Sequence, residues 1–498
     1  MTDRRSFLKR VGLTGTLLAA PSTFIKAIAS PRVEKIDLAN ITVKGQVHSN
    51  GKGLAGVAVT DGFNVTLTSK NGTYELLSNN TAEFVYISIP RGYAIPNQNG
   101  IANFYSRISR GNAVFKTDFA LEKLQQDDSK HNFVVWADPQ IISEADATQL
   151  KTESAPDLRE LVKSYPANSL FHGIGCGDLV WDHFELFDDY KEALRITEIP
   201  FFNVIGNHDM DLDARSDEFS TRTFKSHFGP TYYSFNRGEI HYVVLDDVFF
   251  IGTAKKYIGY LTEMQLQWLE QDLKHVAKGS TVVVSLHIPS NTGTSRRNNL
   301  KEEELGGVVS NRKRLYEILK GYKTHIMSGH THMNEKWEDG DIMEHVHGTV
   351  CGAWWTGPIC SDGCPGGYGV YEVNGSSLKW YHKSTGKPAD YQIKVYPKGT
   401  VKDSPDEIIA NVWNWDPKWQ VKWYEDGVLK GEMERRTALD PLAEQLYAGS
   451  MLPKKHKWVE PTLTDHLFYA KVSANAKKIK VEATDRFGRV YAEDLSIV

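Results

Sequence analysis

Short hydrophobic runs recur in the middle of the chain, and polar residues able to bind metals follow them. With their polar endings the runs read FVVWADPQ, FHGIGCGDLVWD, FFNVIGNHDM, IHYVVLDD, VVVSLHIPS and HIMSGHTH. Runs this short and this apolar predict buried strands. Between them, apolar residues recur at helical spacing, at Leu158, Leu161 and Val162 and again from Thr262 to Ala277. Strands that alternate with helices predict an α/β layer architecture, which we place at residues 130–370.

The two flanking parts of the chain follow a different pattern, in which apolar and polar residues alternate. Residues 40–123 contain period-two segments separated by turn dipeptides such as Asn50-Gly51, which are typical of antiparallel β-hairpins. Residues 371–498 alternate in the same way, with one short helix expected at Pro441–Leu446. We therefore expect an all-β sandwich domain on each side of the α/β domain.

The size and composition of the chain are those of a folded protein with several domains. It has 498 residues, of which 41% are hydrophobic and 11% aromatic, so it can bury more than one core. The N-terminus differs, since Arg4-Arg5 precede a short apolar stretch, residues 11–20, and small residues follow at positions 27–29. This pattern predicts a twin-arginine export signal over residues 1–30, and hence a periplasmic or secreted protein that uses the twin-arginine export machinery.

The net charge of the chain bears on whether it binds a polynucleotide. The chain carries a net charge of −4, and loss of the predicted signal, with five basic residues and one acidic residue, would change it to −8. Proteins that follow a polynucleotide need a basic stripe to neutralise phosphates. We therefore expect no polynucleotide partner.

Cysteines are few, at Cys176, Cys351, Cys360 and Cys364. In an oxidising compartment Cys360 and Cys364 could close a small disulfide loop, or both could remain thiols. Because the chain contains no CxxC pair, we expect no zinc site built from cysteines.

The residues that follow the strand runs have the chemistry of a two-metal site. Such a site needs one bridging carboxylate, several neutral imidazoles, and oxygen ligands that leave positions open for water and phosphate. Two histidines two residues apart after a strand point to the same side, so each can serve a different ion. Our assignment makes Asp178 the bridge, gives one ion Asp138 and His332, and gives the other Asn207, His287 and His330.

In this order, the motifs D-x-Q, GD, GNHD, H-x-P and GHTH resemble those of the calcineurin-like metallophosphoesterases. The resemblance implies an αββα sandwich, a hydroxide that bridges two ions such as Mn, Fe or Zn, and hydrolysis of phosphoesters. It also implies that Asn207 touches phosphate as well as metal. His208 resembles the general acid of the family, which protonates the leaving oxygen, and Asp209 or Asp182 could orient it. The N-terminal sandwich resembles the carboxypeptidase-regulatory-like modules that precede secreted catalytic domains.

Two positions depart from the pattern of that family. Gln140 stands where a histidine is usual, so its amide could bind metal weakly through oxygen, favouring harder ions such as Mn²⁺, or only hydrogen-bond to phosphate. Asp182 falls one residue later than in the phosphatase-like pattern, which leaves open whether Asp182 or Asp209 is the partner of His208.

Other side chains are candidates for substrate binding or support. Arg296 and Arg297 could clamp a substrate phosphate, or they could form a solvated charge pair in a loop. Trp354 and Trp355 could offer an indole face to a base, sugar or acyl group, or pack against the C-terminal sandwich. The strand-end carboxylates Asp246 and Asp247 could orient metal ligands, and the remaining histidines are expected to be structural.

The residues and the resemblance together predict a metallophosphoesterase that uses two metal ions. The expected substrate is a small-molecule or lipid-linked phosphoester: a phosphodiester, a nucleotide-type or sugar-phosphate-type compound, or a phosphomonoester. The alternative is a non-catalytic protein that binds a glycan or lipid head group and carries a relic phosphoesterase domain. A relic domain would be expected to have lost several ligands, whereas here only one of the seven ligand positions, that of Gln140, departs from the pattern.

Overall fold

The computed structural model describes residues 40–78, 80–253, 255–449 and 455–496. The export signal predicted for residues 1–30 lies outside them. Every helix within the described ranges is too short or too polar to span a membrane.

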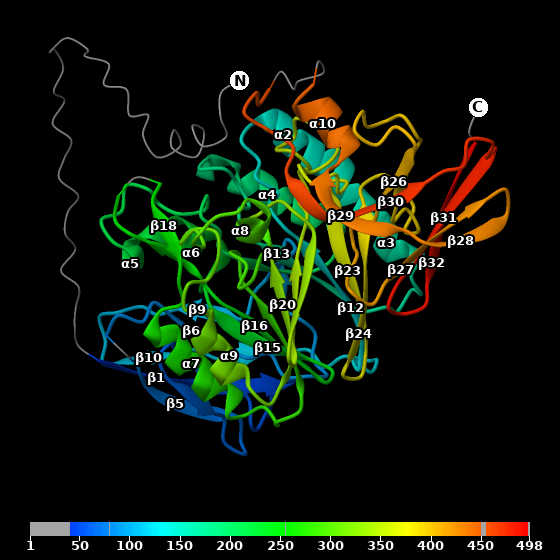
Figure 1. Ribbon diagram of the computed structural model, residues 1–498. Coiled ribbons are helices and arrows are strands. Elements are labelled where there is room, and N and C mark those ends of the chain that lie inside the picture. Colours follow the sequence, from blue (N-terminus) through cyan, green and yellow to red (C-terminus); the bar gives the residue numbers. More distant parts are fainter. Residues whose placement is uncertain (1–39, 79, 254, 450–454, 497–498) are drawn as a thin grey trace, which may run out of the picture. The chain divides into compact units, whose positions relative to one another are not determined.

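Two mixed β-sheets form the centre of the α/β domain (Figure 1). In each sheet the inner strands are parallel, and antiparallel strands cover an edge. The first sheet contains, in spatial order, β24 (Ser377–Ser384), β23 (Gly367–Asn374), β12 (Lys130–Trp136), β13 (Phe171–Cys176), β14 (Phe201–Val204), β8 (Ile101–Ala102) and β7 (Asn97–Gln98). The second contains β15 (Tyr233–Arg237), β16 (Ile240–Val244), β19 (Thr281–Ser285), β20 (Lys323–Ser328), β22 (Ile342–Val346) and β21 (Glu335–Asp339).

The side chains of β12 show why these strands are apolar on both faces. Phe133 and Val135 pack in one core together with residues of the second sheet, such as Tyr242 and Val284. Val134 and Trp136, which point to the opposite face, pack in a separate core with helix residues. Since alternate residues of a strand face opposite sides, each sheet has one face on the other sheet and one face on helices. The structure thereby confirms the predicted αββα sandwich.

Helices cover the two outer faces of the sandwich. The first sheet packs on α3 (Ala155–Ser164) and α4 (Phe187–Thr197), and the second on α7 (Glu263–Leu273) and α9 (Arg312–Leu319). Helix α7 begins at its N-cap Thr262, whose side chain accepts a hydrogen bond from the backbone N–H of Gln265, as capping requires. The shorter elements of this domain are α2 (Glu144–Gln149), the π-helix η1 (Leu150–Ser154), the 3₁₀-helix η2 (Phe184–Leu186), α5 (Asp217–Ser220), α6 (Arg222–Phe228), α8 (Thr294–Arg297), β17 (Val248–Phe250) and β18 (Tyr257–Gly259).

The N-terminal domain is built from two small sheets, one of which combines antiparallel with parallel strand pairs. Asn50 and Gly51 both have positive φ, 49° and 75°, which is the conformation of the tight hairpin turn expected from their sequence. The strands of the two sheets are β1 (Ile41–Ser49), β2 (Lys52–Gly53), β5 (Thr73–Ser78), β10 (Val114–Lys116) and β11 (Phe119–Ala120), and then β3 (Ala58–Thr60), β4 (Val65–Leu67), β6 (Phe84–Ile87) and β9 (Tyr105–Arg107). The predicted N-terminal domain, residues 40–123, includes β7 and β8, and this needs correction. In the structure both strands belong to the catalytic sheet, where β8 pairs in parallel with β14.

The C-terminal domain consists of two four-stranded sheets that share a core. Trp419 and Trp423 are buried in this core, and Trp413 is buried beside Cys360 and Cys364. Helix α10 (Pro441–Tyr447) lies where a short helix is predicted. The strands are β25 (Lys394–Tyr396), β26 (Glu407–Asn411), β30 (Leu463–Lys471) and β29 (Glu434–Leu439), and then β28 (Val428–Glu432), β27 (Gln420–Glu425), β31 (Lys478–Thr484) and β32 (Val490–Ser496).

The predicted boundary between residues 370 and 371 needs correction. It falls inside β23, which pairs along its length with β12 and with β24, so the catalytic sheet extends to Ser384. The physical reason is that β24 covers the edge of this sheet, and an edge strand shows the same period-two pattern as a strand of a sandwich.

Cys360 and Cys364 are free thiols and are buried, as are the other two cysteines.

Candidate metal centre

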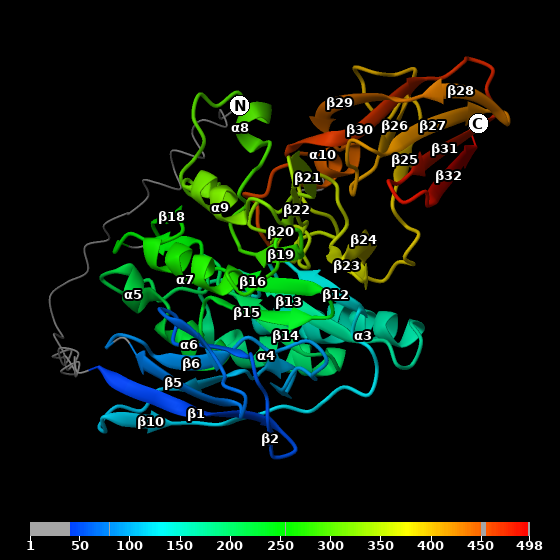
Figure 2. The same ribbon diagram turned by 90° about the horizontal axis from the view of Figure 1, so that it is seen from below.

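The predicted ligands all follow the carboxyl ends of parallel strands in the two central sheets. This is the edge at which open α/β sheets place their sites. Asp138 and Gln140 follow β12, Asp178 follows β13, Asn207 follows β14, His287 follows β19, and His330 and His332 follow β20. In Figure 2 the two sheets can be followed by the labels β12, β13 and β14 and by the labels β16, β19 and β20.

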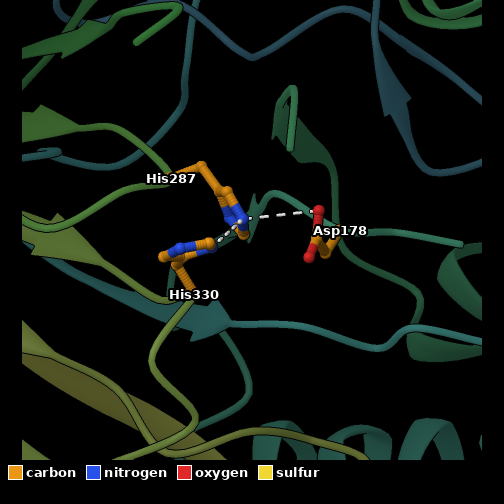
Figure 3. A group of neighbouring side chains, drawn as sticks. All are labelled: Asp178, His287 and His330. Atoms are coloured by element: carbon orange, nitrogen blue, oxygen red, sulfur yellow. Dashed lines mark hydrogen bonds and ion pairs between the residues drawn. The ribbon is translucent and has the colours of Figure 1, made fainter. Parts of the chain in front are cut away.

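Asp178, His287 and His330 form the core of the site (Figure 3). Their ligand atoms lie within 4.8 Å of one another, which is close enough for one metal ion to contact all three. His287 Nε2 lies 3.3 Å from Asp178 Oδ1, 3.2 Å from His330 Nδ1 and 3.1 Å from Asn207 Oδ1. These four residues are the bridging carboxylate and the second-ion ligands of the sequence assignment.

The remaining ligands lie on the other side of Asp178. His332 Nε2 is 3.4 Å from Asp138 Oδ1, and the backbone N–H of His330 donates to Asp138 Oδ2 at 3.0 Å. Gln140 Nε2 donates to Asp178 Oδ2 at 2.7 Å, and Gln140 Oε1 is buried without a hydrogen-bond partner. The structure therefore brings all seven predicted ligands to one place.

The charges at this site suit metal cations. Asp138, Asp178, Asp209 and Asp247 are at most 1% exposed, and no ion pair within the described ranges joins any of them to a lysine or arginine. Buried carboxylates are unfavourable unless a positive charge balances them. Together with the unpaired Gln140 Oε1, these carboxylates and the imidazole donors beside them form a ligand set that fits bound cations.

The ionisation of the core residues reflects their proximity. Burial opposes ionisation of Asp178, but the charges of His287 and His208 outweigh burial and hold the pKa of Asp178 far below its usual range. Burial opposes protonation of His287, but Asp178 raises the pKa of His287 to about 10. Burial and the charge of His287 lower the pKa of His330 to about 4. Cation binding would take the place of the proton on His287, because metal ligation requires neutral imidazole.

The backbone at the ligands adopts a conformation that few residues adopt. A left-handed φ is uncommon outside glycine and is concentrated at functional sites. Here the left-handed residues lie in the loops that follow β12, β13 and β20. The φ values are 48° for Asp138, 38° for Gln140, 49° for Asp178, 67° for His330 and 56° for His332.

Gly177 allows the closest approach between two of these loops. It has a φ of 80°, and a Cβ at this position would lie 2.2 Å from Nδ1 of His287. We expect Gly177→Ala to reduce the affinity for Mn²⁺ by about 10–100-fold, as when the support of a metal ligand is lost, since the His287 ring must move. Titration calorimetry with Mn²⁺ measures this change.

Gly279→Ala is the matched control. Gly279 has a φ of 86° with nothing within 4 Å of an added Cβ, so this variant carries the backbone strain, ~1–2 kcal/mol, without the collision. Its Mn²⁺ affinity should equal that of the wild type. Equal Mn²⁺ affinities for the two alanine variants would show that Gly177 does not support His287.

His208 lies beside the metal ligands and is held by a carboxylate. Its Nδ1 lies 2.9 Å from Asp182 Oδ1, and Lys255 Nζ donates to Asp182 Oδ2 at 2.7 Å. Its side chain is 22% exposed, whereas that of His287 is fully buried, so His208 can reach a substrate. Burial lowers the pKa of His208, but Asp178 and Asp182 outweigh burial and raise it above its ordinary value.

Asp209, one of the two carboxylates considered as partners of His208, faces the backbone of the ligand loops. Its carboxylate is buried and accepts hydrogen bonds from the backbone N–H groups of Gly206, Leu179 and Val180. It therefore ties together the two loops that carry Asp178 and Asn207, while Asp182 is the residue that contacts the ring of His208. Burial, and then the charge of Asp178, raise the pKa of Asp209 to about 7.

Asp247 supports His287, as predicted for the strand-end carboxylates. Its Oδ1 accepts hydrogen bonds from the backbone N–H groups of His287 and Ile288 at 3.0 and 3.3 Å. The Nδ1 of His287 lies 3.0 Å from the carbonyl oxygen of Cys176. An Nδ1–H donated to this carbonyl leaves Nε2 free to bind metal.

Arg296 and Arg297 are paired with acidic residues. Both guanidinium groups contact Asp465 of β30, and Arg297, which is buried, also contacts Glu335. These contacts join the loop after His287 to the C-terminal domain. The structure gives the two arginines partners other than a substrate phosphate, and the phosphate clamp stays a prediction.

Aromatic side chains border the metal centre. Trp354 stacks on the ring of His332, with ring centroids 4.2 Å apart. Trp355 Nε1 donates to the carbonyl oxygen of Pro139 at 2.8 Å and thereby supports the loop that carries Gln140. The contact of Tyr257 with His330, at 6.0 Å between ring centroids, was not anticipated from the sequence. Tyr257 belongs to a two-stranded sheet outside the central strands, so strand-end reasoning gave no signal for it.

Comparisons with known proteins agree with this geometry. The chain matches three family descriptions: "N terminal of Calcineurin-like phosphoesterase" over residues 41–124, "Calcineurin-like phosphoesterase" over residues 99–334, and "C terminal of Calcineurin-like phosphoesterase" over residues 344–491. Together they span nearly all of the described residues. Asp138, Asp178, His287, His330 and His332 fall within the central match.

Among individual proteins, the chain is similar to purple acid phosphatase 15 of Arabidopsis thaliana, with 28% identity over 171 residues, or 31% of this chain and 28% of the relative. The chain therefore matches less than a third of that relative's length. A purple acid phosphatase, PPD1, from yellow lupin superposes with a TM-score of 0.36 and 14% identity over 51% of this chain and 52% of its own. A 5'-nucleotidase from Candida albicans gives a TM-score of 0.31 and 13% identity over 50% of each chain.

Proposed function

This chain belongs to the calcineurin-like phosphoesterase family, and we propose that it hydrolyses a phosphodiester with the help of two metal ions. When bound, ions of the Mn, Fe or Zn type supply Lewis acidity and activate water for attack on phosphorus. Asp138, Gln140 and His332 would hold one ion, and Asn207, His287 and His330 the other. Asp178 would contact both.

The arrangement of His208 carries this proposal. Its backbone N–H donates to Asp178 Oδ1 at 2.8 Å, which places the imidazole beside the carboxylate shared by the two ions. Asp182 holds Nδ1, so Nε2 is the atom that can give a proton to the leaving oxygen. A positioned general acid of this kind accelerates reactions about 10²–10⁴-fold.

The basic side chains near the metal centre are already paired with acidic residues, which favours a phosphodiester substrate over a phosphomonoester. Arg296, Arg297 and Lys255 already form ion pairs with acidic side chains. A phosphomonoester dianion carries one more negative charge than a diester and gains more from an additional cationic clamp. A substrate with a single negative charge is better matched to the described residues. A phosphomonoesterase is the second candidate, in agreement with the similarity to purple acid phosphatase 15.

Two chromogenic substrates test the proposal. With Mn²⁺ present, we expect a higher kcat/KM for bis-p-nitrophenyl phosphate than for p-nitrophenyl phosphate, and removal of metal with a chelator should abolish both activities. The reverse order would favour the monoesterase. If the Mn²⁺-loaded protein hydrolyses neither compound, the glycan-binding or lipid-head-group-binding alternative regains support.

A further inference from the structure

Three partly exposed tryptophans form a corner beside the metal centre, namely Trp181, Trp354 and Trp458. The ring centroids of Trp354 and Trp458 are 4.6 Å apart, with an interplanar angle of 68°. Those of Trp181 and Trp458 are 5.6 Å apart at 87°. We call these three residues the indole corner. They come from distant parts of the chain, so only the fold brings them together.

The indole corner reaches both the candidate acid and a metal ligand. Trp181 contacts His208, with ring centroids 5.3 Å apart, and Trp354 stacks on His332. His208 is the group that would protonate the leaving oxygen. The organic group attached to that oxygen would therefore lie beside Trp181.

Trp458 is held in this position from both sides. Val459 is 1% exposed and packs with Ala443 and Tyr447 in a small core of the C-terminal domain. On the other side, Lys455 forms an ion pair with the buried Asp146 near the start of α2. A segment fixed at two points loses little entropy when a ligand binds against it.

The exposure of these indoles distinguishes them from tryptophans that only fill a core. Trp136, Trp268 and Trp413 are among the most deeply buried side chains, whereas each member of the indole corner keeps part of its surface accessible. Ligand pockets are lined mainly by apolar and aromatic groups around a few polar residues. Accessible indoles next to a cluster of metal ligands match that description.

The angles between the indoles indicate what kind of group fits. Aromatic rings attract one another in stacked or edge-to-face arrangements. A flat ring that stacks on one of two nearly perpendicular indoles presents its own edge to the other indole. It can therefore make a stacked contact and an edge-to-face contact at once. A saturated group of similar size gains only from burial.

We infer that the indole corner selects phosphoesters whose leaving group carries an aromatic ring, such as an aryl group or a nucleobase. The inference rests on the proposed function and deepens it. It makes the segment around Trp458, in the C-terminal domain, part of the substrate site. Trp181, Trp354 and Trp458 are specificity residues, and the hydrolytic step does not require them.

Binding of three unreactive phosphonates tests this inference. Phenylphosphonate, cyclohexylphosphonate and methylphosphonate share one head group and differ in an aromatic, a saturated or a minimal substituent. By titration calorimetry on the Mn²⁺-loaded protein, we expect phenylphosphonate to bind about tenfold more tightly than methylphosphonate, as one stacked ring would provide. Cyclohexylphosphonate should lie between them. Equal affinity for the phenyl and cyclohexyl compounds would overturn the aromatic preference.

Variants of Trp458 test whether the indole corner causes the preference for phenylphosphonate. Trp458→Ala should remove the phenyl preference and leave methylphosphonate affinity unchanged, whereas Trp458→Phe should keep most of it. Leu429→Ala, at a residue of the same domain that is 52% exposed, is the control and should behave as wild type. If Trp458→Ala does not fold, Trp181→Leu provides the same test from the other side of the corner. A phenyl preference that survives the folded variant would contradict the inference.

The same titrations separate this inference from the proposed function. Methylphosphonate binding and phosphoester hydrolysis without any phenyl preference would overturn the indole corner alone. Failure of the Mn²⁺-loaded protein to bind any of the three phosphonates, together with failure to hydrolyse p-nitrophenyl esters, would overturn the proposed function and the inference with it.

Discussion

Asp178→Asn is expected to reduce kcat on bis-p-nitrophenyl phosphate by about a thousandfold. The carboxylate is 1% exposed and lies 3.3 Å from His287 Nε2 and 2.7 Å from Gln140 Nε2. It is the group placed to contact both ions, and an amide cannot supply two anionic oxygens. Loss of several kcal/mol of transition-state stabilisation corresponds to that factor. Steady-state kinetics with saturating Mn²⁺ would measure it.

Asp272→Asn is the matched control for this substitution. Asp272 is also a buried aspartate paired with a histidine, since its Oδ2 lies 2.8 Å from His241 Nε2. It joins α7 to the second sheet and belongs to none of the loops that carry the metal ligands. We expect it to affect thermal stability and to leave kcat and metal content near wild type. A similar loss of kcat in both variants would mean that general destabilisation explains the result.

His208→Ala is expected to reduce kcat by about 10²–10⁴-fold with metal content unchanged. The reason is that His208 would supply the proton for the leaving oxygen, and His208 is not among the residues assigned as metal ligands. The loss should be larger for esters of poor leaving groups, such as alkyl alcohols, than for p-nitrophenyl esters, because p-nitrophenolate leaves without protonation. Kinetics on both kinds of ester, with metal analysis of the same samples, would test this.

His183→Ala serves as the control for His208. His183 lies in the neighbouring loop, pairs with Glu185 and is 46% exposed, so its loss should not change kcat. Equal losses on alkyl and p-nitrophenyl esters in His208→Ala would contradict the assignment of His208 as general acid. Such a result would assign His208 to the binding of substrate phosphate.

The ligand positions could be predicted from the sequence because strand ends converge in a parallel sheet. Each of Asp178, Asn207, His287 and His330 follows a short apolar run, and the carboxyl ends of such strands meet at one edge. Burial on both faces made the strands recognisable. The αββα arrangement was implied by the resemblance of the motifs to those of the calcineurin-like metallophosphoesterases.

Contacts between distant segments could not be predicted in this way. The period-two pattern of residues 377–384 does not specify which sheet the strand joins, and in the structure it covers the edge of the catalytic sheet. The charge of Arg297 carries no information about its partners, Glu335 and Asp465. Likewise, the sequence around Trp458 does not show that it meets Trp181 and Trp354, because that contact depends on how the C-terminal segment packs.

The two carboxylates considered as partners of His208, Asp209 and Asp182, illustrate the same limit. Asp209 follows it directly, yet its side chain turns inward and accepts backbone N–H groups of two loops. Asp182 lies far away in sequence and makes the contact with the ring. Adjacent residues in a tight loop point in different directions, so the sequence did not decide between Asp182 and Asp209 as the partner of His208.

Metal analysis tests most directly whether the converging strand ends hold a pair of cations around Asp178. The full chain, purified without chelator and dialysed against Mn²⁺, should contain about two metal ions per molecule by mass spectrometry, as the two-metal chemistry requires. Asp178→Asn should contain fewer, while Asp272→Asn should match the wild type. A folded wild-type protein that retains no metal under these conditions would contradict the proposed centre.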